Sequence, residues 1–305
     1  MINKLKKFFL YSNVRFSYLA KLGVFNYMSD EKYLKKKWWS IYRKKLDLKN
    51  PKTYNEKIQW LKLYDRNPKY TQLVDKYEVK KYIADVIGEE YIIPTIGIYN
   101  KFNEIDFKKL PNQFVIKTTH NSGGVIICKN KSEFDIVTAR HKINQLLKCN
   151  YYYYGREWPY KNVKPRIIIE KYMEDTIVKN IRDYKFFCFD GKVKIFYISD
   201  CSHTANQKII FYDDKFNELP ISRTDYKKFD IKPKKPVNFE KMLELSKRLS
   251  MGIPHVRVDW YEIDGNIYFG EMTFYTGSGW IPFTKEIYDI ELGNYIELPL
   301  SKKEE

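Results

Sequence analysis

The segment from His255 to Phe274, HVRVDWYEIDGNIYFGEMTF, constrains the fold more than any other part of the chain. Apolar and polar residues alternate along it, and the central Asp264-Gly265 dipeptide favours a tight turn, so the segment predicts a β-hairpin. Four polar residues on its two strands follow the same two-residue period: Arg257, Asp259, Glu271 and Thr273. If these side chains share a face, two carboxylates, a guanidinium and a hydroxyl can hold a divalent metal against a phosphate chain.

The register of this hairpin decides whether the four side chains meet. With a two-residue loop, Asp259 and Glu271 fall on opposite faces of the sheet. A three-residue loop over 264–266, or a one-residue bulge, brings Asp259 opposite Glu271 and Arg257 opposite Thr273. We predict the looser turn. The alternative is an ordinary amphipathic hairpin whose polar face is solvated.

Length and composition place the chain among ordinary globular proteins. Its 305 residues and 44% hydrophobic content suffice for one large or two modest packed domains, which excludes disordered and fibrous classes. No run of 18 apolar residues is present, so no segment is predicted to span a membrane. Four cysteines without C-x-x-C spacing and four scattered histidines favour reduced thiols over disulfides or zinc, and they predict a cytoplasmic protein.

The positive charge gathers near the N-terminus. Residues 1–50 hold 13 Lys or Arg and three acidic residues, which accounts for +10 of the formal net charge of +17. Aromatic residues are interspersed with these cations, a composition that suits an anionic membrane surface or an acidic polymer. We expect a helical extension that makes peripheral contact with such an anionic surface. The alternative is a soluble extension without that role. No nucleic-acid-binding module is recognisable, so no nucleic acid partner is expected.

The remaining chain predicts alternating helices and strands. Thr53 and Glu56 form a capping-box pattern at the start of one helix, and a second helix is expected from Thr71 to Val86. Strand character begins at Tyr91. The later elements are expected as a strand–loop–strand unit over 114–129, helices over 134–149 and 238–250, a buried strand over 167–173 and a hairpin over 183–199.

The loop His120-Asn121-Ser122-Gly123-Gly124 joins two of the predicted strands. Its glycines permit close backbone approach, and consecutive amide hydrogens in such a loop can bind phosphate oxygens. Lys117, on the strand that enters the loop, can reach the same phosphates as a point charge. A plain hairpin connection and a solvated surface lysine are the alternatives.

The order of these elements resembles that of the ATP-grasp ligases, and more specifically the TupA-like ATP-grasp family of bacterial surface-polysaccharide synthesis. The segments that carry the resemblance, over residues 46–299, are NPKTYNEKIQWLKLYD, VDKYEVKKYI, VIKTTHNSGG, IIIEKYM, DYKFFCFDG, VRVDWY and GEMTFYTGSGW. The resemblance implies an α+β fold in which two α+β subdomains clasp a nucleotide. The expected divisions are a basic helical extension (1–50), a helical pre-grasp region (51–110), the first ATP-grasp subdomain (111–175) and the second subdomain with the metal site (176–305).

The resemblance also implies which residues bind ATP and Mg²⁺. The nucleotide would be held by Lys76 and Lys117 at the phosphates, by Ser122, Gly123 and Gly124 in a flap, by backbone groups of Glu170, Lys171 and Tyr172 at the adenine, and by Asp183 near the ribose. Magnesium would be bound by Asp259, Glu271 and Thr273, although many ATP-grasp enzymes carry Asn in place of Thr273. The catalytic residues would be Arg257, which steadies the transferring phosphoryl group, and Lys185 near the γ-phosphate or the substrate.

The chemistry that the resemblance implies is ATP-dependent carboxylate–amine ligation through an acyl phosphate. Because a carboxylate repels an anionic triphosphate, magnesium and Lys or Arg side chains must offset that charge. The expected reaction belongs to capsular or other cell-surface polysaccharide synthesis and joins a uronic acid, in a glycan or sugar nucleotide, to an amino acid or amino alcohol. The loop over 276–279 is a further candidate for holding the substrate. Alternatives are an ATP-dependent sugar kinase and a non-catalytic, glycosyltransferase-like assembly protein.

Overall fold

The structure, a computed structural model, describes residues 6, 9–176, 181–200 and 206–299. Its described α-helices are α2 (Ser12–Lys21), α3 (Asp30–Tyr42), α4 (Tyr54–Tyr64), α5 (Lys69–Val74), α6 (Glu78–Val86), α7 (Ile136–Leu147), α8 (Tyr152–Gly155), α9 (Phe239–Ser250) and α10 (Glu286–Asn294). Its strands are β1 (Thr95–Tyr99), β2 (Phe114–Thr118), β3 (Ile126–Cys128), β4 (Ile167–Lys171), β5 (Asp183–Phe189), β6 (Lys192–Asp200), β7 (Lys208–Asp213), β8 (Val256–Ile263) and β9 (Asn266–Thr273). Cys201 and His203 lie outside the described residues.

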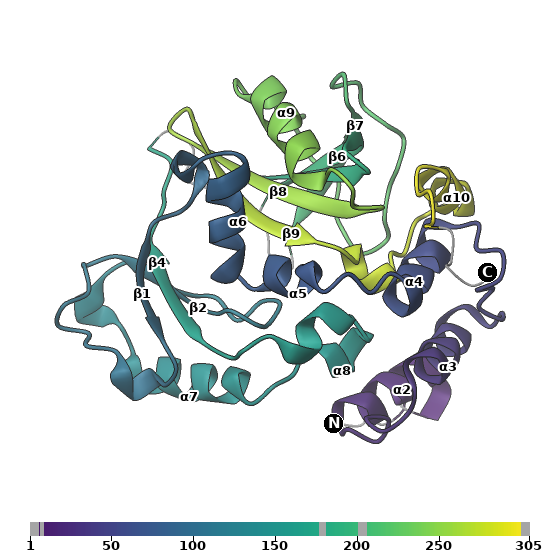
Figure 1. Cartoon of the computed structure of the whole chain (residues 1–305), viewed down its shortest axis with the longest axis horizontal. Helices are drawn as coiled ribbons and strands as arrows, with labels where there is room; N and C mark the ends of the chain where they lie inside the picture. The colour runs from purple at the N-terminus through teal and green to yellow at the C-terminus, as the bar shows by residue number, and fades with distance from the viewer. Residues whose placement is uncertain (1–5, 7–8, 177–180, 201–205, 300–305) are drawn as a thin grey trace.

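The first sheet has the strand order β1-β4-β2-β3. Its interior strand β4 is buried on both faces, since Ile167, Ile168 and Ile169 are all 0% exposed, as expected for a run of β-branched residues. Helix α7 runs beneath this sheet (Figure 1), and its Ile143 packs into the same apolar cluster as Phe114. The strand–loop–strand unit and the helix expected from the sequence are therefore both present.

The second sheet has the order β7-β6-β5-β8-β9. Helix α9 covers one of its faces (Figure 1), where Met242, Leu245 and Leu249 are buried completely. The indole N–H of Trp260 on β8 donates to the Ser246 hydroxyl of that helix at 2.8 Å. Because side chains alternate along a strand, fixing Trp260 toward α9 directs its neighbour on β8 to the opposite face.

The β8–β9 hairpin has the register that the site requires, but not the turn that we predicted. Ile263 pairs with Asn266, so the turn has only two residues, with φ of 48° at Asp264 and 73° at Gly265. The register then shifts: Trp260 pairs with Phe269, whereas Asp259 pairs with Glu271 and Arg257 with Thr273. Gly270 is therefore the extra residue of a β-bulge, and the looser turn was wrong. A Cβ at residue 270 would lie 3.1 Å from the Asp259 carbonyl oxygen, which favours glycine there.

Two helix predictions have different outcomes. The capping box is confirmed, since the Thr53 hydroxyl accepts from the Glu56 N–H and the Glu56 carboxylate accepts from the Thr53 N–H. The single helix expected over 71–86 is instead two helices, α5 and α6, separated by residues 75–77. At this break the Asp75 carboxylate caps α6, and the Lys76 N–H donates to the Thr119 carbonyl at 3.2 Å. A hydrogen bond to the residue that follows β2 thus takes the place of one within the helix.

The N-terminal extension is a packed unit. α2 and α3 lie beside α8 and α4 (Figure 1) and enclose an apolar cluster that includes Phe16, Tyr33, Leu34 and Trp38. Tyr33 Oη donates to the Tyr154 carbonyl at 3.1 Å, which ties α3 to α8. Among the described residues, no helix combines the length and the apolar composition needed to cross a membrane.

Candidate active site

A cleft open to solvent is lined by residues of both sheets, of α6 and of the glycine loop. Nine of the predicted site residues line it: Lys76, Lys117, Ser122, Gly123, Glu170, Asp183, Lys185, Asp259 and Glu271. The other five, Gly124, Lys171, Tyr172, Arg257 and Thr273, are not among its lining residues. The fold thus brings together side chains from five separate sequence segments.

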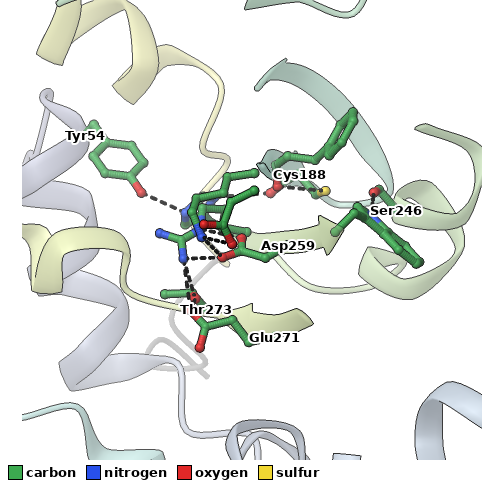
Figure 2. A network of polar contacts seen from close by, with 12 residues as sticks. Tyr54, Cys188, Ser246, Asp259, Glu271 and Thr273 are labelled. Carbon is green, nitrogen blue, oxygen red and sulfur yellow. Dashed lines mark hydrogen bonds and ion pairs between the residues drawn. The ribbon is translucent and has the colours of Figure 1, made fainter. Parts of the chain in front are cut away.

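A network of charged side chains forms the wall of the cleft on the side of the second sheet (Figure 2). The Arg257 guanidinium donates to both oxygens of Asp259, each at 2.6 Å, and the Lys185 ammonium donates to one of them at 2.6 Å. Lys185 also lies 3.3 Å from Asp183. Although burial opposes it, Asp259 and Asp183 raise the pKa of Lys185 above its usual value. Lys185 therefore carries a positive charge at neutral pH.

Glu271 is the more accessible carboxylate of the pair. Its Oε1 accepts from Arg257 at 3.1 Å and from the Thr273 hydroxyl at 3.0 Å, while the side chain remains 44% exposed. Burial opposes ionisation, but Arg257, Lys185 and Lys76 together lower the pKa of Glu271 to about 2. Glu271 is therefore ionised and faces the cleft, whereas Thr273 lies behind it and supports its orientation.

The carboxylates fit a magnesium site of the kind found with nucleotides. Among the described residues, no group of three or more His, Cys, Asp or Glu side chains could hold a metal alone. In nucleotide sites, however, Mg²⁺ is bound by one or two carboxylates together with phosphates and water. Asp259 and Glu271 lie directly opposite each other on β8 and β9 and both line the cleft, which meets that requirement.

The opposite wall of the cleft is basic. Glu170, 5% exposed, holds the ammonium groups of Lys80 at 2.5 Å and Lys117 at 2.7 Å. Burial acts against it, but Lys117 and Lys80 lower the pKa of Glu170. Lys80 lines the cleft and was missed in the sequence, although it follows Lys76 by four residues, a spacing that could have suggested a shared face.

Part of the backbone that we predicted to contact adenine, at residues 170–172, is already hydrogen-bonded within the protein. The Lys171 N–H donates to the Pro94 carbonyl at 3.0 Å, so this donor is engaged within the sheet. The Glu170 side chain is engaged by two lysines. Tyr172 follows the end of β4 and lies near the ammonium of Lys129, which is 5.8 Å from its ring centroid. Any hinge contact must therefore use backbone groups other than the Lys171 N–H.

The glycine loop is held at its base and open at its tip. The Lys76 ammonium donates to the Asn121 carbonyl, and the His120 ring nitrogen Nε2 lies 3.2 Å from the Leu146 carbonyl oxygen. Gly123 and Gly124 have φ of 78° and 74°, which favours glycine. A Cβ at Gly124 would lie 2.5 Å from Leu146, whereas one at Gly123 would meet no atom within 4 Å. The backbone at Gly123 thus faces open space beside the cleft.

The solved structures similar to this chain include several ligases. The D-alanine–D-alanine ligase of Helicobacter pylori is 17% identical at a TM-score of 0.44, over 80% of this chain and 69% of that one. The Bacillus anthracis enzyme complexed with ATP is 19% identical at 0.37, over 67% and 55%. The ATP-grasp ligase PsnB with minimal precursor, Mg and ADP is 10% identical at 0.37, over 72% and 57%. The chain spans little more than half the length of the last two, and these similarities carry no argument about activity.

The family comparison is decisive for the fold. No curated protein matches the sequence. The model of the TupA-like ATP-grasp family, however, matches residues 56–297, which is most of the chain and includes every predicted site residue. The α+β ATP-grasp fold expected from the sequence is thereby confirmed, and ligases of this fold use ATP and Mg²⁺. The chain therefore belongs to the TupA-like ATP-grasp family.

Proposed function

We propose that this protein is an ATP-dependent ligase that joins the carboxylate of a uronic acid to the amine of an amino acid or amino alcohol during capsular or other cell-surface polysaccharide synthesis. The observation that carries the proposal is the pairing of two carboxylates, Asp259 and Glu271, with the cations of a single cleft. Such a cleft offsets the repulsion between an anionic triphosphate and an anionic acceptor. The glycan acceptor follows from the family resemblance, and it can be a sugar nucleotide or a longer glycan.

The cleft supports a division of roles among the chain's own residues. Lys76 and Lys117 would bind the phosphates below the loop Ser122-Gly123-Gly124, with Asp183 at the ribose and backbone groups near Tyr172 at the adenine. Asp259 and Glu271 would hold Mg²⁺, which when bound lowers the negative charge on the phosphate oxygens. Lys185 would contact the transferring phosphoryl group.

Arg257 has a different geometry from Lys185. Its side chain is only 9% exposed and it donates to Asp259, Glu271 and Thr273. It would therefore act first as a positioning residue that fixes both carboxylates, and any contact with the phosphoryl group would be secondary. Thr273 would serve the same purpose through its hydrogen bond to Glu271, in place of direct metal binding.

The proposed reaction has two steps. An acceptor carboxylate oxygen attacks the γ-phosphorus of ATP, which forms an acyl phosphate and releases ADP. The amine then attacks the acyl carbon, inorganic phosphate leaves with the electron pair of the broken C–O bond, and loss of a proton from nitrogen gives the amide. Lys185 remains protonated throughout, so it can donate to phosphoryl oxygens in both steps.

We also propose that the enzyme works in the cytoplasm at the inner face of the plasma membrane. A glycan built on a lipid carrier would present its uronic acid there. The basic and aromatic composition of residues 1–50 supports peripheral contact with an anionic membrane surface.

The test is ADP release from the full chain with uronate sugar nucleotides and oligosaccharides against a panel of amines, with product masses measured. We expect ADP release that needs both substrates and a product equal to their sum less water. Glu271→Gln should lower turnover about 10³-fold, whereas Glu240→Gln, whose side chain is 77% exposed on α9, should not.

Two outcomes would overturn this proposal. A product that retains a phosphoryl group, formed without an amine, would favour the sugar kinase. The absence of any MgATP-dependent rise in melting temperature would favour the non-catalytic assembly protein, because a ligand that binds the folded state must stabilise it.

A further inference from the structure

Helix α3 has two dissimilar sides. Tyr33, Leu34 and Trp38 point inward and are at most 1% exposed. On the other side Trp39 is 52% exposed, a large value for the largest apolar side chain. The basic residues that share this outer side at helical spacing, all of them exposed, are Lys32, Lys35, Lys36 and, at the C-cap, Arg43.

Helix α2 repeats this pattern. Its Phe16 is buried against α3, and the side opposite Phe16 carries exposed residues at positions i, i+4, i+7 and i+11. These are Tyr11, Arg15, Tyr18 and Leu22, and in the following turn Tyr27 is fully exposed. We call these residues, together with Lys32, Lys35, Lys36, Trp39 and Arg43, the basic-aromatic face.

The basic-aromatic face has almost no negative charge. Residues 1–45 contain 12 Lys or Arg but only two acidic residues, Asp30 and Glu31. Asp30 is engaged by Arg66 at 3.0 Å and by the Tyr152 hydroxyl. Glu31 pairs with Lys35 at 2.5 Å and is the one carboxylate on the outer side of α3. The excess of positive charge on this face is therefore not balanced within the unit.

The two helices are firmly joined to the body of the protein. Arg156 donates to the Phe25 carbonyl at 2.5 Å, and Lys37 donates to the Tyr154 carbonyl at 3.3 Å. The rings of Trp38 and Trp280 lie 5.8 Å apart. These inward residues make the contacts that hold the unit in place.

We propose that the basic-aromatic face is a docking surface for an anionic phospholipid bilayer. Amphipathic Trp and Tyr rings are favoured at the membrane interface, and exposed aliphatic chains such as Leu22 lose contact with water there. Each Lys or Arg near an anionic leaflet adds to the attraction. The inference concerns where the proposed ligase works, but it rests on this surface and not on the reaction.

Other partners fit the face less well. A second copy of the chain would set like charges against each other, because the same surface would meet itself. Nucleic acid would accept the cations and aromatic rings, but it gives Leu22 no apolar environment. A bilayer alone satisfies the charged, the aromatic and the aliphatic residues together.

The position of the face has a consequence for the substrate. Trp38 and Tyr42 contact Trp280, which directly follows the Thr276–Gly279 segment, η5. This segment comes after β9, which carries Glu271. Docking through α2 and α3 would hold η5 and the adjoining end of the site at a fixed position relative to the bilayer, as an acceptor on a lipid carrier requires.

The experiment measures co-sedimentation of the full chain with vesicles, without ATP or acceptor, so its result is independent of ligase activity. We expect binding to vesicles of equal parts phosphatidylcholine and phosphatidylglycerol, and little binding to phosphatidylcholine alone. The double variant Lys32→Glu/Lys36→Glu should weaken binding at least about tenfold, and Trp39→Ala about fivefold. Truncation of residues 1–45 is unsuitable because it removes Phe16, Tyr33 and Trp38 from a buried cluster.

Matched controls lie on α9 and in the segment before it. Lys241→Glu/Lys247→Glu makes the same charge change, and Val237→Ser removes an apolar side chain that is 91% exposed. Both should bind like the unchanged protein, and all variants should keep its melting temperature. Equal binding to neutral vesicles, or equal loss in the controls, would overturn the proposal. So would a dimer that Trp39→Ala dissociates, or tighter binding to single-stranded DNA than to anionic vesicles.

Discussion

Lys185 and Lys62 are both largely shielded from solvent, but their pKa values shift in opposite directions. Lys185, in the wall of the cleft, lies 2.6 Å from Asp259 and 3.3 Å from Asp183, and these carboxylates raise its pKa against the effect of burial. Lys62 on α4 is 0% exposed, and burial lowers its pKa to about 7 although Glu157 opposes the shift. The partners of the Lys62 ammonium are the Gln59 side chain at 3.1 Å, the Gly155 carbonyl at 2.8 Å, and the carbonyl and hydroxyl of Ser278 at 2.7 and 2.9 Å.

The difference shows that the cleft requires a charged lysine, whereas the junction of α4, α8 and η5 requires only a hydrogen-bond donor. An ionised carboxylate in direct contact preserves the positive charge of Lys185, which an anionic substrate requires. Neutral dipoles around Lys62 satisfy hydrogen bonds without preserving charge, so Lys62 serves to hold η5 against α8 and α4. Glycine is needed at that junction, because a Cβ at Gly155 would lie 2.2 Å from the Ser278 hydroxyl.

The largest expected effect comes from Asp259→Asn. Both carboxylate oxygens accept hydrogen bonds from cations, so an amide NH₂ would face a donor and leave Arg257 or Lys185 uncompensated. Removing one member of a buried ionic network costs about 3 kcal/mol of stability. Loss of the metal carboxylate should also lower turnover about 10³-fold.

Urea unfolding and ADP release measure the two effects of Asp259→Asn separately. Asp230→Asn, whose side chain is 82% exposed beside Lys208, is the matched control and should change neither quantity appreciably. If Asp259→Asn unfolds like the unchanged protein, the charge network is not a unit. The contrast between the two lysines would then lose its basis.

The sequence predicts the fold where local chemistry decides it. The Thr53–Glu56 capping box, the hairpin that turns at Asp190-Gly191 and the isoleucine run of β4 all depend on neighbouring residues. The register of the β8–β9 hairpin, in contrast, does not depend on neighbouring residues alone. The hairpin combines a tight turn at Asp264-Gly265 with the inward burial of Trp260. Both are possible because Gly270 is an unpaired extra residue that forms a bulge in β9. That choice depends on packing against α9, which the segment alone does not reveal.

The same limit applies to the candidate site. Nine of the residues that the family resemblance implied for the site line one cleft. The residue types and their order did not reveal that Arg257 lies behind the carboxylates or that the Lys171 N–H pairs with Pro94. The break between α5 and α6 at Lys76 was also hidden, because no Gly or Pro marks it and a bond to Thr119 supports it. Contacts between distant segments determine each of these features.

Lys62→Met should alter the pH dependence of stability. Because folding lowers the pKa of Lys62 from about 10.4 to about 7, the unfolded chain binds more protons than the folded one between these values. The Lys62 contribution to stability therefore rises with pH in this window, by about 2 kcal/mol from pH 7 to pH 9. Lys62→Met should lose this rise, whereas Lys185→Met, whose lysine pKa is raised on folding, should keep it. Urea unfolding at pH 7, 8 and 9 measures how the free energy of unfolding changes with pH. The same change with pH in Lys62→Met and in the unchanged protein would contradict the contrast between Lys62 and Lys185.

The smallest effect is expected at a third lysine, which lies in solvent. Lys35 pairs with Glu31 one helical turn away, and both side chains are about half exposed, so water and salt screen the pair. Glu31→Gln should therefore cost only about 0.3 kcal/mol in urea unfolding, at any pH between 7 and 9. Because it removes the one carboxylate on the outer side of α3, it should also strengthen co-sedimentation with anionic vesicles slightly. Weaker vesicle binding by Glu31→Gln would mean that the basic-aromatic face does not bind vesicles through its charge. A stability loss as large as that of Asp259→Asn would mean that burial does not determine how much each lysine's ion pair contributes to stability.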